Sequence, residues 1–265
     1  MPHSPALLAV AALLGLAVGA LVVRPLVFAF CVEDAWRRSC PHCGSPVLGA
    51  GWGAFADLVM RRCRTCSPAT AAPEVAVAVA PGPGGSSEPV RIGPAALLPE
   101  VLTAAAVWGI VAAGAGGWLL AAQLWVAVLG SAMLLIDLQV QRLPNLLTGA
   151  TGAGVALLLA GQALTGSGWQ VLLRPAVAVV LVGGLLFLAA LFGLLGLGDV
   201  KLAPGLVALL AAQGWATLYW GVLAQFVFGF LQALVQAARA GGRRAEVAFG
   251  PGLIVGTLVV SALAG

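Results

Sequence analysis

The stretch that decides the fold is Val101–Ile136, VLTAAAVWGIVAAGAGGWLLAAQLWVAVLGSAMLLI, which holds 36 residues and no Asp, Glu, Lys or Arg. At 1.5 Å per residue, a helix of this length measures about 54 Å. The hydrocarbon core of a bilayer is only about 30 Å thick. We therefore expect two membrane-spanning helices here, hinged at Gly114–Gly117.

The composition of the whole chain also indicates a membrane protein. It has 265 residues, of which 61% are hydrophobic and 8% charged, with a mean hydropathy of +1.06. A soluble domain usually has about 25% charged residues. This composition excludes an ordinary cytosolic protein, a disordered chain and a nucleic-acid binder. The 36 glycines suit helices that pack closely in lipid. The predicted fold class is an all-α polytopic membrane protein.

Further uncharged runs bring the expected number of spans to eight. The first is interpreted as a retained anchor, because it lacks a basic start and a clear cleavage site. The spans are expected in Ala6–Val23, Val101–Ile136 (two), Leu143–Leu173, Ala176–Gly198, Leu202–Ala238 (two) and Val247–Ala264.

The basic residues predict the orientation. With the N-terminus outside, the loops after the odd-numbered spans hold twelve of the thirteen Lys and Arg residues, and only Arg174 lies opposite. Such an excess is typical of cytoplasmic loops. The twelve are Arg24, Arg37, Arg38, Arg61, Arg62, Arg64, Arg91, Arg142, Lys201, Arg239, Arg243 and Arg244.

The predicted organisation is a first transmembrane helix over 1–30, an insert over 31–94 and a seven-span core over 95–265. The insert holds Cys40-Pro41-His42-Cys43 and, after 19 intervening residues, Cys63-Arg64-Thr65-Cys66. Two such pairs are typical of a zinc ribbon, because four thiolates complete a tetrahedral Zn²⁺ shell. Two disulfides or free structural thiols are the alternatives, and a reducing cytoplasmic side disfavours disulfides.

The rest of the insert carries less information. Cys31 is expected to be a buried small side chain at a span end, and His42 is a weaker candidate ligand than the four thiols. Residues 69–89 are rich in Ala, Pro, Gly and Ser and predict a flexible linker. In so small an insert, bound metal would supply much of the folding free energy.

Two aspartates stand out in the core. Asp137 follows a long apolar run, and Asp199 lies in Gly196-Leu197-Gly198-Asp199. Ionisable side chains in membrane spans are costly and mark functional sites. We place both aspartates at the cytoplasmic ends of their spans, the third and the fifth. Two carboxyl groups that share a proton can activate a water and polarise a carbonyl, which is aspartic-protease chemistry.

Neighbouring residues would shape this site. Gly196 and Gly198 would allow a close approach to the carboxylate, and Pro144 would stop helix continuation after Asp137. Lys201 is interpreted as an anchor at the membrane surface rather than a base. Both aspartates also have structural readings, since Asp137 could be solvated at the interface and Asp199 could cap a helix beginning at Val200.

The motifs, taken in order, resemble those of the type IV prepilin peptidases, which are membrane aspartic proteases of the GxGD type. The resemblance covers nearly the whole chain. It rests on five segments: the cysteine pairs with their flanking arginines, Leu98–Thr103, Ile136-Asp137 with Leu143–Thr148, Gly196–Leu202 and Phe249-Gly250-Pro251.

This resemblance implies a bacterial inner-membrane enzyme that cleaves the leader of prepilins or pseudopilins at the cytoplasmic face. Asp137 and Asp199 would be its catalytic pair. It also implies possible N-methylation of the new N-terminus with S-adenosylmethionine. The chain departs from the family pattern at Gly19–Val23 and at residues 49–57, and we assign no residue to S-adenosylmethionine.

Other classes stay open at this point. Paired membrane aspartates also occur in proton- or cation-coupled transporters, although the chain shows no convincing internal repeat. A presenilin-like protease that cuts within a substrate's span would not need the cysteine insert. A structural membrane subunit with inactive aspartates is the weakest alternative.

Overall fold

The structure is a computed structural model that describes residues 4–31, 37–41, 43–49, 52–61, 63, 65–66, 92–193, 195–240 and 249–264. These residues form helices and loops, and their one β-bridge pairs Ser39 with Pro46. Several sequence predictions lie outside the described residues: the His42 ligand, the 69–89 linker, and the arginines at 62, 64, 91, 243 and 244.

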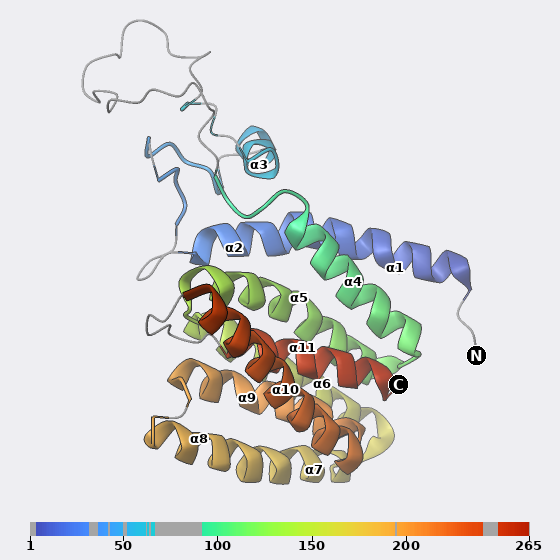
Figure 1. The fold of residues 1–265 in the computed structure, drawn as a ribbon. Coiled ribbons are helices and arrows are strands. Elements are labelled where there is room, and N and C mark those ends of the chain that lie inside the picture. Colours follow the sequence, from blue (N-terminus) through green and yellow to red (C-terminus); the bar gives the residue numbers. More distant parts are fainter. Residues whose placement is uncertain are drawn as a thin grey trace, which may run out of the picture.

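Most helices form one bundle, and the short helix α3 lies apart from it beside the ends of α2 and α4 (Figure 1). Three π-helical segments, η1 to η3, continue α1, α6 and α7. The described elements are α1 (Pro5–Val18), η1 (Gly19–Val23), α2 (Arg24–Phe30), α3 (Trp52–Val59), α4 (Leu98–Ala113), α5 (Gly117–Val140), α6 (Asn145–Gln162), η2 (Ala163–Ser167), α7 (Gln170–Ala178), η3 (Val179–Gly183), α8 (Gly184–Leu191), α9 (Leu197–Gln213), α10 (Trp215–Ala240) and α11 (Gly250–Leu263).

Length and composition make this a multi-pass membrane protein. Five of the described helical segments are long and apolar enough to cross a bilayer, and α4 and α11 are shorter apolar helices. The predicted helical, polytopic class is therefore confirmed. The five segments are Pro5–Phe30, Gly117–Val140, Asn145–Gly166, Gln170–Leu191 and Trp215–Ala238.

The hinge predicted at Gly114–Gly117 falls where the chain does turn. Gly114, which ends α4, and Gly117, which begins α5, have positive φ angles of 90° and 60°. Two further turns divide the later apolar runs: Gly214 separates α9 from α10, and Thr165 and Gly166 leave helical geometry after α6. Backbone conformations that favour glycine therefore divide the apolar runs.

Two predicted boundaries were wrong. The helix predicted to carry Asp199 at its end stops at Leu191, and Gly193 follows with a φ of 72°. Asp199 instead lies in the first turn of the next helix, α9, which begins at Leu197 rather than Leu202. The first span continues past Val23 to Phe30, because Arg24 is buried inside the protein instead of marking a loop.

An ion pair explains the burial of Arg24. Its Nε and NH2 atoms donate hydrogen bonds of 2.6 and 2.7 Å to the two carboxylate oxygens of Glu100 on α4. Both residues are buried, at 1% and 6% exposure. The pair therefore joins the first helix to α4 at the point where the insert leaves the bundle.

Close helix packing supports the same contact. A Cβ atom on Gly15 would come within 2.6 Å of Ala104 Cα, and one on Gly19 within 2.5 Å of Glu100 Cα. The spacing of four residues places both glycines on one face of the helix. Small residues at this spacing let helix backbones approach in a membrane, as the glycine content predicted.

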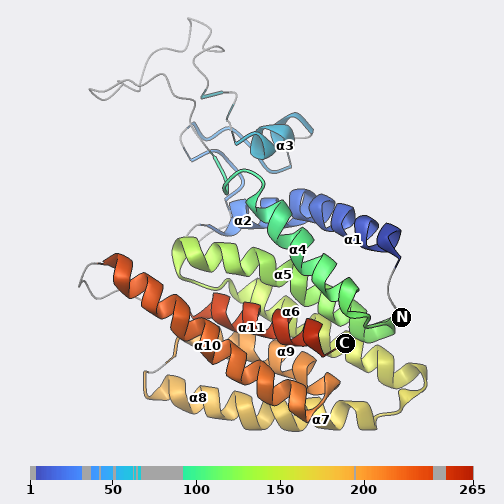
Figure 2. The same cartoon turned by 45° about the vertical axis from the view of Figure 1, so that its right-hand side comes forward.

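Helix α5 occupies the centre of the bundle, in contact with α2, α4, α6, α9 and α11 (Figure 2). Its buried face includes Val126, Met133 and Ile136 in the main hydrophobic cluster. The insert has a separate, much smaller cluster that contains Phe28 of α2 together with Val47, Leu58 and Ile92. Phe28 thus anchors the insert on the end of the first membrane helix.

Candidate functional site

The two aspartates come from antiparallel helices. Asp137 lies in the last turn of α5 and Asp199 is the third residue of α9. Both line one cavity of about 340 Å³ at this end of the bundle. The other lining residues are Gln141, Arg142, Leu143, Asn145, Gly196, Leu197, Gly198, Lys201 and Phe249.

Asp137 is almost fully buried, at 3% exposure. The backbone N–H of Gly250, at the start of α11, faces its carboxyl group. Atom Oδ2 has no hydrogen-bond partner among the described residues. A buried polar atom without a partner is costly, which marks this carboxyl group as a candidate functional group rather than a structural one.

The start of α11 leaves no space beside this carboxyl group. A Cβ atom on Gly250 would lie 2.8 Å from Asp137 Oδ2 and 3.2 Å from Leu143 Cδ1. Glycine is therefore the residue that lets the α11 backbone contact the aspartate. In the sequence, Phe249-Gly250-Pro251 contributes only to the family resemblance, and no role of Gly250 in the site is predicted from it.

Asp199 is 9% exposed. Its carboxyl group accepts a hydrogen bond from the backbone N–H of Gly196, the N-cap of α9, and lies close enough to Asp137 for their charges to interact. The bond back to the N-cap resembles half of a capping box. The helix expected to begin at Val200, with Asp199 as its N-cap, therefore begins three residues earlier, at Leu197. Asp199 both supports this helix start and lines the cavity.

The two predicted glycines differ in their surroundings. A Cβ atom on Gly196 would lie 3.3 Å from Asp199 Oδ2, which is a tight contact. One on Gly198 would lie 3.5 Å from Leu143 Cβ, which is an ordinary distance. The steric requirement for glycine is therefore stronger at Gly196 than at Gly198.

Lys201 lines the cavity, whereas the predicted site residue Pro144 precedes α6 and is not one of the lining residues. Pro144 is the extended N-cap of α6 and lies beyond Gln141, a left-handed residue with a φ of 53° that ends α5. Exposed Lys201 donates a 2.8 Å hydrogen bond from Nζ to Asn145 Oδ1, which ties the first turn of α9 to that of α6. Helices α6, α9 and α11 all begin at this cavity, so partly positive helix ends surround the two carboxyl groups.

An amide pair joins the two aspartate helices at the end opposite the cavity. Gln123 on α5 donates 3.4 Å to Gln213 on α9, and both donate to Ser261 Oγ on α11, at 3.0 and 2.7 Å. Each Gln lies fourteen residues from the Asp on its own helix, about 21 Å or nearly four turns away. Pairing at the glutamine end therefore brings the aspartates together at the other end.

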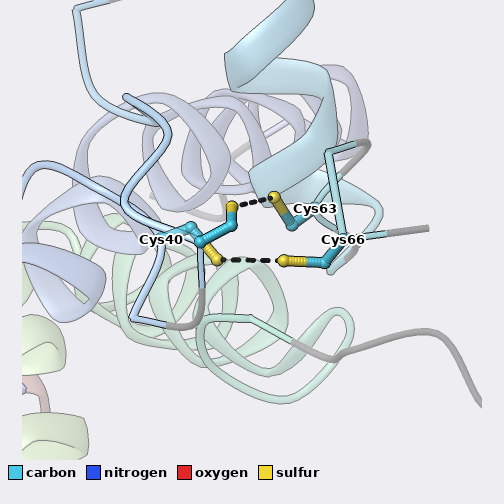
Figure 3. A group of neighbouring side chains, drawn as sticks. Cys40, Cys63 and Cys66 are labelled. Carbon is cyan, nitrogen blue, oxygen red and sulfur yellow. Dashed lines mark hydrogen bonds between the residues drawn. The ribbon is translucent and has the colours of Figure 1, made fainter. Parts of the chain in front are cut away.

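The cysteines form a second site. The four Sγ atoms of Cys40, Cys43, Cys63 and Cys66 all lie within 4.8 Å of one another. The Cys40–Cys66 separation is 3.8 Å (Figure 3). The Cys43–Cys63 separation is 3.5 Å. Tetrahedral zinc with bonds of about 2.3 Å requires sulfur atoms roughly 3.8 Å apart. The donor set and its spacing thus fit a metal such as zinc, and all the cysteines are free thiols.

Ser45 supports this cluster. Its hydroxyl group lies 3.0 Å from Cys43 Sγ and 3.4 Å from Cys63 Sγ. Although burial opposes ionisation, hydrogen bonds from Ser45 and the Cys66 backbone N–H lower the pKa of Cys63 to about 6. Cys31 behaves differently: it is half-buried at the end of α2, and burial raises its pKa to about 11. Cys31 was predicted to be a buried side chain at a span end, and it lies at such an end but is only half-buried.

Comparison with known proteins adds no assignment. No protein-family model, curated protein or solved structure matches the chain. The function of the protein is therefore inferred from its two sites and its sequence motifs.

Proposed function

We propose that the protein is a membrane aspartic endopeptidase whose catalytic pair is Asp137 and Asp199. The observation that carries the proposal is their meeting in one cavity, 62 positions apart in sequence and on two different helices. Two charges this close cannot both ionise cheaply, so the pair holds one proton between its carboxyl groups. Aspartic-protease chemistry needs this state.

The proposed reaction uses both protonation states. The ionised carboxylate removes a proton from a water, while the protonated carboxyl group donates a hydrogen bond to the scissile carbonyl oxygen. The hydroxide adds to the carbonyl carbon, and the resulting tetrahedral intermediate expels the amine, which takes up a proton from the pair. Backbone N–H groups at the starts of α9 and α11 face the carboxyl groups and orient them.

We further propose that the substrate is a prepilin or pseudopilin, a single-span protein whose leader lies at the membrane surface. This rests on the family resemblance, and the location of the cavity at a helix-bundle end supports it. A substrate segment at the bilayer surface can reach such a cavity without leaving its own span. N-methylation with S-adenosylmethionine remains an expectation of the resemblance.

The membrane arrangement we propose has eight crossings, with an outside N-terminus and a cytoplasmic insert. A helix lies at each of the eight predicted places in the described chain. The first turn of α1 and the last turn of α11 lie at the same end of the bundle, as an even number of crossings requires (Figures 1 and 2). The excess of basic residues in the odd loops supports the orientation.

The test is co-expression with a prepilin, followed by mass spectrometry of the pilin. The intact protein should remove the leader, and Asp137→Asn or Asp199→Asn should lower cleavage at least about a thousandfold, since acid–base groups contribute about 10² to 10⁴ each. An added mass of about 14 Da, one CH₂ group, would report N-methylation.

Asp57→Asn is the matched control, because it removes an acidic side chain from α3, outside the cavity. It should cleave normally. Cleavage by either cavity variant at the normal rate, with equal abundance in the membrane, would reject the catalytic pair. Proton-coupled solute uptake that is lost in the same two variants, without any cleavage, would favour the transporter alternative.

A further inference from the structure

A second cavity, which shares no lining residue with the aspartate cavity, lies between the first membrane helix and the insert. It measures about 460 Å³. Its walls include Leu21, Val22 and Leu26 from the helix, and Arg38 and Leu48 from the insert. Neither the proposed peptidase chemistry nor the cysteine cluster uses it.

The apolar wall continues into the lipid-facing surface. Leu21 and Val22 are 54% and 41% exposed and lie in the π-helical turn η1. Phe30 and Ala29 at the far end of the cavity belong to the main hydrophobic cluster. The cavity is therefore an apolar groove that opens along the membrane helix and closes against the protein core.

Arg38 sits over this groove on a fixed backbone. Its carbonyl oxygen accepts hydrogen bonds of 2.9 and 3.0 Å from the Val47 and Leu48 N–H groups, next to the Ser39–Pro46 bridge. The side chain is exposed, and none of the described residues provides it with an acidic partner. The knuckle that holds Cys40 thus also presents to the groove a guanidinium group for which the described part of the chain provides no acidic partner.

Helix length places Arg38 at the level of the lipid headgroups. The first helix has 26 residues, which measure about 39 Å, against a hydrocarbon core of about 30 Å. Its last turns, from Pro25 to Phe30, extend beyond that core. Leu21 and Val22 then face acyl chains while Arg38 faces phosphate groups.

We propose that this cavity binds one anionic phospholipid, with its phosphate on Arg38 and an acyl chain along Leu21 and Val22. Arginine pairs with phosphate through two parallel hydrogen bonds, and an apolar groove beneath a cation complements a lipid that is charged at one end only. A free phosphate ion would leave the apolar wall exposed to water. The bound lipid joins the insert to the bilayer surface.

The test uses the full-length protein in detergent with zinc bound. Native mass spectrometry would measure the retention of phosphatidylglycerol and of phosphatidylcholine with the same acyl chains. The intact protein should retain the anionic lipid preferentially, and Arg38→Ala should weaken that retention at least about fivefold, the ratio that corresponds to about 1 kcal/mol for one basic residue at a lipid surface.

Two further variants separate charge from shape. Arg239→Gln removes one positive charge from α10, which contributes no residue to this cavity, and should retain the lipid normally. Val22→Trp fills the groove without changing the charge and should weaken retention. Each variant should keep the zinc content of the intact protein, which shows that the insert is folded.

Three results would overturn the proposal. The first is equal loss of phosphatidylglycerol in Arg38→Ala and Arg239→Gln, which would indicate only a general attraction between opposite charges. The second is equal retention of the two lipids by the intact protein. The third is displacement of the lipid by soluble glycerol phosphate, which would show that the apolar wall contributes nothing.

Discussion

The bundle and the insert of this protein are held together in different ways. In the bundle, α5 is surrounded by apolar helices, and glycines allow backbones to touch. The described part of the insert has one short helix and a cluster of six buried residues, two of which are cysteines. A core this small supplies little folding free energy, so we expect a metal on the four cysteines to supply the rest. The difference between the two regions predicts that packing in lipid stabilises the bundle and that metal ligation stabilises the insert.

Metal removal should separate the two regions most clearly. Structural zinc sites contribute apparent free energies of about 10–16 kcal/mol, so a chelator or Cys63→Ser should unfold the insert. The bundle should keep its helical circular dichroism, while proteolysis cuts within residues 31–94. Cys31→Ser is the control and should leave metal content unchanged. Loss of bundle helicity along with the metal would show that the two regions fold as one.

The Arg24–Glu100 pair tests the junction between the regions. Breaking a buried ion pair by removing one partner costs about 3–5 kcal/mol, because the other charge stays buried. Glu100→Gln should therefore lower the thermal midpoint measured by tryptophan fluorescence in detergent. The double variant Arg24→Met with Glu100→Met should recover most of the loss. If the double variant did not recover the thermal midpoint, the pair would stabilise the protein by more than the attraction between its charges.

Gly250 offers a test inside the bundle, where helix packing reaches the proposed catalytic pair. Gly250→Ala places a methyl group against Asp137 Oδ2 and should displace the carboxyl group. A misplacement of about 1 Å can cost about a hundredfold in rate, so leader cleavage should fall by roughly ten- to a hundredfold. Gly149→Ala on α6, where a Cβ atom would meet no neighbour within 4 Å, should cleave normally.

The smallest expected change in stability concerns Gln123. Interhelical hydrogen bonds in membranes average about 0.6 kcal/mol and reach about 1.7, so Gln123→Met should barely lower the thermal midpoint. If the amide pair sets the register, cleavage should nevertheless fall severalfold through kcat, with KM unchanged. Gln162→Met, at the end of α6, is the control. A normal kcat for Gln123→Met would show that packing alone aligns the aspartates.

Much of the architecture could be predicted from composition and spacing. Uncharged runs about as long as a bilayer is thick predict helices, because lipid offers the backbone no hydrogen-bond partners. Paired cysteines predict a metal site, since two C-x-x-C pairs suffice for a tetrahedral shell. Helix ends were harder to predict, as Asp199 and Arg24 show, because caps and buried ion pairs decide them.

The sequence by itself determined the membrane class, the cysteine cluster and the identity of the two candidate aspartates, because hydropathy and ligand spacing are local properties. Only the tertiary structure decided that α5 and α9 run antiparallel in matching register, that Gly250 contacts Asp137, and that Glu100 neutralises Arg24. Those facts depend on contacts between segments that lie between 76 and 113 positions apart in the chain. Such contacts cannot be predicted from local sequence patterns, because they form only when whole helices pack together.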